Sequence, residues 1–120
     1  MDNLDGLRYY QMSLKLWDLC WSDVETMMKD IRGREITKQM IRAVGSISAN
    51  IEEGYGKGTT KEYSRSLKIA RGSSREARGW YIKSKYLMDK NLIDDRCQAL
   101  DKISAMLTKA IHTLENNSRK

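Results

Sequence analysis

Apolar residues recur at alternating steps of three and four positions through most of this 120-residue chain, and no proline interrupts the pattern. Such steps place side chains on one face of an α-helix, which has about 3.6 residues per turn. Because proline is the residue that most strongly breaks helices, its absence leaves every segment free to be helical. The chain is therefore predicted to be all-α, with one apolar face on each helix.

The first two helices are predicted on either side of Arg32-Gly33-Arg34, which interrupts the apolar pattern. The first should span residues 9–31, and its inward face would hold Tyr10, Leu14, Trp17, Trp21, Val24, Met28 and Ile31. The second should span residues 35–54, and its inward face would hold Ile36, Met40, Ala43, Ile47, Asn50 and Gly54. Small residues in this second helix would let a neighbouring helix approach closely.

Alternating glycines mark the end of the second helix. Gly54, Gly56 and Gly58 weaken a helix and permit positive φ. Thr59 and Glu62 then have the spacing of a capping box, in which both side chains satisfy free amides at a helix start. The turn is interpreted as a helix terminator, and a phosphate contact on the free amides is the alternative.

The third and fourth helices follow from the same spacing. The third should span residues 60–88, and its inward face would hold Tyr63, Leu67, Ala70, Ser74, Ala77, Tyr81 and Met88. The fourth, capped by Asp94, should span residues 94–115, with an inward face of Cys97, Leu100, Ile103, Leu107, Ala110, Ile111 and Leu114. Four helices joined by short loops predict a single domain over residues 1–120, an antiparallel up-down-up-down four-helix bundle.

Positive charge is concentrated in the third helix. The net charge is +6, and residues 61–90 hold nine basic against three acidic side chains. On a helical wheel, the cations lie opposite the apolar face. Eight of them form what we name the basic stripe: Lys57, Lys61, Arg65, Lys68, Arg71, Arg75, Arg78 and Lys83. Since only Glu62 and Glu76 offset them, we predict binding to a polyanion such as RNA or DNA; an ordinary solvated face is the alternative.

The sequence gives little support for catalysis or for binding of a metal or cofactor. Asn50, Glu52 and Glu53 are interpreted as structural residues rather than a catalytic site. His112 is the single histidine, so no metal site, no cofactor and no catalytic residue are expected. Cys20 and Cys97 fall on helical apolar positions and are expected to be buried free thiols. An acidic amino terminus and the lack of a long apolar run predict a cytoplasmic protein that does not contact membranes.

The second and third helices resemble a known family. The resemblance is carried by Gln39, Arg42, Ser46-Ile47, Ala49-Asn50-Ile51, Glu53-Gly54-Tyr55-Gly56, Leu67, Ala70, Gly72-Ser73 and Glu76. These residues are similar to the signature of the bacterial four-helix bundle proteins encoded by intervening sequences of 23S ribosomal RNA. Ser48 stands where that family usually has proline, and Arg75 and Arg78 add charge that many members lack.

That family resembles, in fold, the accessory variability determinants of diversity-generating retroelements. The resemblance implies a homopentamer that binds nucleic acid and partners a reverse transcriptase. The function expected is that of a non-enzymatic, nucleic-acid-binding homo-oligomer that assists such an enzyme. The alternative is a protein adaptor whose basic face docks an acidic partner without binding nucleic acid.

Overall fold

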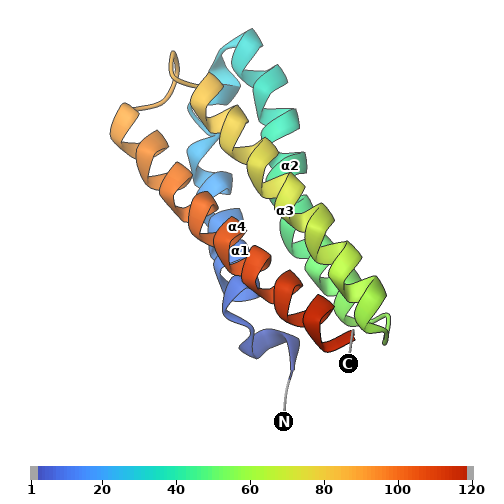
Figure 1. The fold of residues 1–120 in the computed structure, drawn as a ribbon. Helices are drawn as coiled ribbons and strands as arrows, with labels where there is room; N and C mark the ends of the chain where they lie inside the picture. The colour runs from blue at the N-terminus through green and yellow to red at the C-terminus, as the bar shows by residue number, and fades with distance from the viewer. Residues whose placement is uncertain (1–2, 119–120) are drawn as a thin grey trace.

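The computed structural model describes residues 3–118, which fold into an antiparallel bundle of four α-helices (Figure 1). Helix α1 spans Arg8–Asp23, α2 spans Ile31–Tyr55, α3 spans Thr60–Lys83 and α4 spans Lys90–Ser118. Two short 3-10 turns, η1 (Leu4–Gly6) and η2 (Met27–Lys29), precede α1 and α2. The bundle measures 52 × 22 × 21 Å. The predicted all-α four-helix bundle is confirmed.

The helices are arranged so that α1 and α3 lie diagonally opposite. Helix α3 packs along both α2 and α4, while the shorter α1 packs against the same two helices. The start of α1 and the end of α4 lie at the same end of the bundle in Figure 1. Exposed faces of α1 and α3 therefore belong to opposite sides of the molecule.

The core is built mainly from the predicted faces of α2, α3 and α4. Leu67, Ala70, Ala77 and Tyr81 of α3 are fully buried. The fully buried or nearly buried residues from the other two helices are Met40, Ala43, Ile47, Cys97, Leu100, Ile103, Leu107 and Ile111. Both cysteines are buried free thiols, as predicted. Burial of this apolar surface is the dominant stabilising term.

The predicted inward face of the first helix is wrong for most of its residues, although Tyr10 and Val24 are buried as predicted. Leu14 and Trp21 are exposed, and the buried apolar residues of α1 are Tyr10, Leu16 and Cys20. The predicted pattern combined residues of three elements, because α1 ends at Asp23 while Met28 and Ile31 belong to η2 and α2. Both of these are also exposed. An apolar surface therefore faces outward along α1 and the start of α2.

Capping residues explain why the starts of α2 and α4 differ from the predicted starts. Asp30 accepts hydrogen bonds from the amides of Arg32 (2.8 Å) and Gly33 (3.2 Å), so α2 begins at Ile31 and includes the predicted Arg-Gly-Arg break. The third helix ends at Lys83 rather than residue 88. Asp89, not Asp94, caps α4 by accepting from the amides of Asn91 (3.0 Å) and Leu92 (3.3 Å). Helix α4 extends to Ser118 rather than residue 115.

Candidate nucleic-acid interface

The basic stripe lies on the side of α3 that points away from the core. Thr59 caps the helix, as predicted, since its hydroxyl accepts from the Glu62 amide at 3.1 Å. Burial of the apolar face of α3 then fixes the direction of the cations. Six of them are exposed, namely Lys57, Lys61, Arg65, Lys68, Arg75 and Lys83, whereas Arg71 and Arg78 are half-buried. Residue 57 precedes α3, and the other seven lie on it.

Three stripe residues bind α4 instead of facing solvent alone. Lys68 Nζ lies 2.6 Å from Glu115, and Arg78 Nε lies 2.8 Å from Asp101. Arg71 donates a hydrogen bond of 3.1 Å to the Thr108 hydroxyl. Such partly exposed pairs contribute about 0–1 kcal/mol each. All three contacts hold α3 against α4, and the carboxylates of Glu115 and Asp101 neutralise part of the charge of the basic stripe.

The remaining cations form two groups. Lys57 pairs with Glu53 at 3.2 Å, and Lys83 lies over the Trp80 ring at 4.5 Å from its centroid. By contrast, Lys61, Arg65 and Arg75 have no ion-pair partner within residues 3–118. These three side chains therefore present positive charge that no side-chain partner among the described residues holds. Arg71 and Lys83 also keep their charge, because their partners, Thr108 and Trp80, are neutral.

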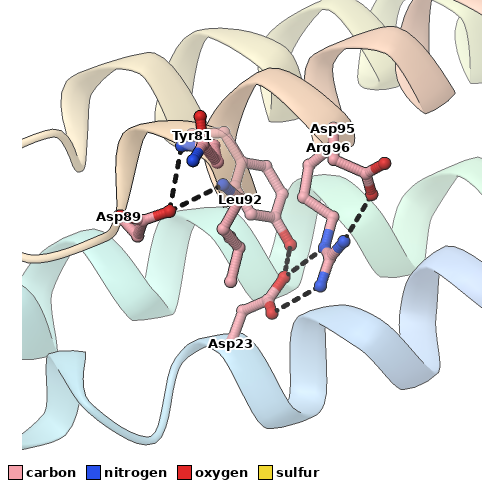
Figure 2. A network of polar contacts seen from close by, with 7 residues as sticks. Asp23, Tyr81, Asp89, Leu92, Asp95 and Arg96 are labelled. Atoms are coloured by element: carbon pink, nitrogen blue, oxygen red, sulfur yellow. Dashed lines mark hydrogen bonds and ion pairs between the residues drawn. The ribbon is translucent and has the colours of Figure 1, made fainter.

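A second polar cluster, which the sequence did not reveal, joins α1, α3 and α4 (Figure 2). The Asp23 carboxylate accepts hydrogen bonds from Tyr81 (2.8 Å) and from Arg96 Nε (2.8 Å) and Nη2 (3.0 Å). Arg96 also pairs with Asp95 at 2.6 Å. Burial raises the pKa of Tyr81 and raises the pKa of the neighbouring Cys20 thiol to about 11. Both groups stay neutral at physiological pH, so the cluster is suited to holding helices together.

Several signature residues of α2 and α3 pack these two helices together. A Cβ at Gly54 would overlap the Cβ of Ser66, so glycine permits the close approach of α3. Asn50 donates to the Ser46 carbonyl at 2.7 Å, and the Ser46 and Ser73 hydroxyls bond at 2.9 Å across the two helices. Asn50 bonds within its own helix, which agrees with the structural role expected for it.

Helices able to span a membrane and clusters able to hold a metal ion are both absent from residues 3–118, the described part of the chain. None of its helices combines the length and apolar composition that crossing a membrane requires. Nor do histidine, cysteine, aspartate and glutamate side chains gather in threes in a way that could hold a metal ion there.

The fold and the basic stripe together define a small helical bundle with one cationic helix face. A family model described as the 23S rRNA-intervening sequence protein matches residues 5–109. The chain therefore belongs to the 23S rRNA-intervening sequence protein family. No curated protein matches the chain.

A solved structure shares this fold. It is the 1.70 Å crystal structure of a protein with unknown function from the S23 ribosomal protein family of Bacteroides thetaiotaomicron. The two chains are 20% identical and superpose with a TM-score of 0.78, covering 86% of this chain and 97% of the other. At this identity the likeness establishes the fold alone.

Proposed function

We propose that this protein is a non-enzymatic homo-oligomer that binds nucleic acid through the basic stripe. The observation that carries the proposal is the row of cations Lys61, Arg65 and Arg75, which are exposed along one helix and lack internal ion pairs within residues 3–118. A row of this kind matches the repeating phosphates of a nucleic-acid backbone. Binding would be largely independent of sequence, because phosphates carry no base identity.

The cations of the basic stripe differ in how available they are to a phosphate. Lys61, Arg65 and Arg75 can contact phosphates directly. Lys68 and Arg78 would have to exchange a carboxylate on α4 for a phosphate, so part of their contribution is cancelled. We therefore expect the three unpaired cations to account for most of the affinity.

Assembly into a homo-oligomer is supported by the apolar surface of α1 and the start of α2. Trp21 is 63% exposed and Ile31 is 70% exposed. Beside them Val24, Met28 and Ile41 line a groove of about 560 Å³. Thr37 also lines this groove, and its buried hydroxyl has no hydrogen-bond partner among the described residues. Surfaces of this kind mark protein contacts.

A second copy of this chain is the occupant we assign to the groove. Its rim carries both signs of charge, from Glu25 and from Arg34 and Lys38, which suits contact with an identical surface. The groove adjoins α1, and the basic stripe lies on α3, diagonally opposite. Association through the groove would thus leave the basic stripe open. Five copies is the number implied by the family resemblance, and a symmetric ring would repeat the stripe and strengthen weak contacts by multivalency.

The proposed cellular role is to assist a reverse transcriptase by holding its nucleic acid. This part rests on the resemblance to the accessory variability determinants. The genes that flank this one test it, because a neighbouring reverse transcriptase is expected for a retroelement accessory protein. A gene within a ribosomal RNA operon and no such neighbour would contradict it.

Salt dependence of binding tests the proposed function itself. Each phosphate neutralised by a lysine or arginine releases condensed counterions, so affinity for RNA should fall steeply as salt rises. Electrophoretic mobility shifts at low and moderate salt measure this directly. A protein adaptor that docks an acidic partner would show no salt-dependent retention of RNA or DNA, and that result would overturn the proposal.

A further inference from the structure

Two hollows meet where α2 turns into α3. A basic hollow of about 570 Å³ lies between the first turns of α3 and the end of α4, and it is lined by Lys61, Arg65 and Lys68. An aromatic hollow of about 280 Å³ is lined by Tyr55 and Tyr63. Thr60 and Leu114 line both hollows, so the two hollows are adjacent.

The two tyrosines are held in place at the aromatic hollow. The Tyr55 and Tyr63 rings meet edge to face, with centroids 5.8 Å apart and an interplanar angle of 87°. The Tyr63 hydroxyl bonds to that of Tyr9, which fixes the Tyr63 ring. Both side chains are half-buried and line the hollow, so part of their ring surface is open to it. Gly58, with φ +83°, has open space where a Cβ would stand, and the turn therefore leaves the hollow unobstructed.

The basic hollow is already partly occupied by an anion of the chain itself. Glu115 accepts from Lys68 at 2.6 Å and from the Ser64 hydroxyl at 3.4 Å. Lys61 and Arg65 line the same hollow without an ion-pair partner within residues 3–118. An incoming phosphate would therefore bind these two side chains first.

We propose that the two hollows form one site for an unpaired nucleotide, whose base stacks on Tyr55 beside the perpendicular Tyr63 ring while its phosphate binds Lys61 and Arg65. Aromatic side chains next to a cationic groove are the usual means of holding single-stranded nucleic acid. A base within a duplex is paired and stacked on its neighbours, so it cannot enter the aromatic hollow. The proposal rests on the function proposed above and names its ligand, a single strand.

Binding of two labelled RNAs to the full chain tests this site. Fluorescence anisotropy would compare a short oligouridine with a perfectly paired RNA duplex of equal length. Tyr55→Leu keeps apolar bulk but removes the stacking ring, so it should weaken oligouridine binding about tenfold and leave duplex binding unchanged. Tyr55→Phe should keep wild-type affinity. Tyr86→Leu, which removes a tyrosine that is 84% exposed and outside both hollows, should also change neither affinity.

A crosslinking measurement on the unaltered protein does not depend on the folding of a variant. Oligouridine containing 5-iodouridine should crosslink to Tyr55 or Tyr63 on irradiation, as mapped by mass spectrometry. Adducts found only elsewhere, or an unchanged oligouridine affinity in Tyr55→Leu, would overturn the nucleotide site while duplex binding still upheld the proposed function. If neither RNA bound, the proposed function itself would fail, and the site with it.

Discussion

Asp23, at the end of α1, receives two hydrogen bonds from Arg96 of α4, at 2.8 Å from Nε and 3.0 Å from Nη2. The side chains are only 4% and 13% exposed, respectively. Helix α1 is the shortest of the four described helices and leaves much of its apolar surface uncovered. This buried ion pair therefore fastens the least embedded helix to the rest of the bundle.

Removing one partner of this ion pair should strongly reduce the stability of the fold. Arg96→Met would leave the buried Asp23 carboxylate without its cation, and such losses destabilise proteins by about 3–5 kcal/mol. The double variant Asp23→Asn with Arg96→Met should lose less than the single variant, because no uncompensated charge remains. Urea denaturation of the wild type, both single variants and the double variant measures the coupling. Strictly additive effects would show that the pair does not act as a unit.

Alanine substitutions of two glycines on neighbouring helices should change stability in opposite directions. Gly54→Ala would place a methyl group on Ser66 and force α2 and α3 apart, at a cost of about 1–3 kcal/mol. Gly72→Ala meets nothing within 4 Å and replaces an exposed glycine inside a helix, so it should stabilise by about 0.5–1 kcal/mol. Thermal melts followed by circular dichroism compare the two. A stabilising Gly54→Ala would contradict the close packing of α2 against α3 at Ser66.

The sequence predicted the bundle and the position of the basic stripe because both follow from helical periodicity. It failed where periodicity is ambiguous. Helix α1 has two apolar stripes, and the more aromatic one, which includes Trp21, faces outward, while Asp23 is buried against Arg96. No local spacing reveals an ion pair between residues so far apart in the chain. The same limit applies to Lys68 and Arg78, whose partners lie on α4.

Lysine substitutions on the outward apolar surface test assembly. Wild-type protein should scatter light as a multiple of its 13.9 kDa chain at micromolar concentration. Trp21→Lys with Ile31→Lys should yield monomers with unchanged helicity, because both side chains already face solvent in the isolated chain. Gln98→Lys with His112→Lys, at exposed positions of α4, provides the matched control and should leave the mass unchanged. A monomeric wild type would refute the oligomer.

Glu115 should restrain binding by occupying Lys68. Glu115→Gln removes the carboxylate that lies 2.6 Å from Lys68 Nζ, so this lysine becomes available to a phosphate. We expect RNA affinity to rise severalfold at low salt, and the slope of log affinity against log salt to steepen by about one. Asp18→Asn, which makes the same charge change at an exposed position of α1, diagonally opposite α3, is the control. Equal gains in both variants would indicate a general charge effect rather than the release of Lys68.

Charge reversal at the three unpaired cations tests the central claim most directly. The variant Lys61→Glu, Arg65→Glu and Arg75→Glu is compared with Lys15→Glu, Lys29→Glu and Lys102→Glu, which removes the same charge from exposed positions outside the basic stripe. Salt titrations of RNA binding should show that the first variant loses most of its affinity and that its slope becomes shallower by about three. The control should stay close to wild type, and circular dichroism should show both variants folded. If the first variant bound RNA as tightly as wild type, or the two variants lost affinity equally, α3 would not be the nucleic-acid-binding surface.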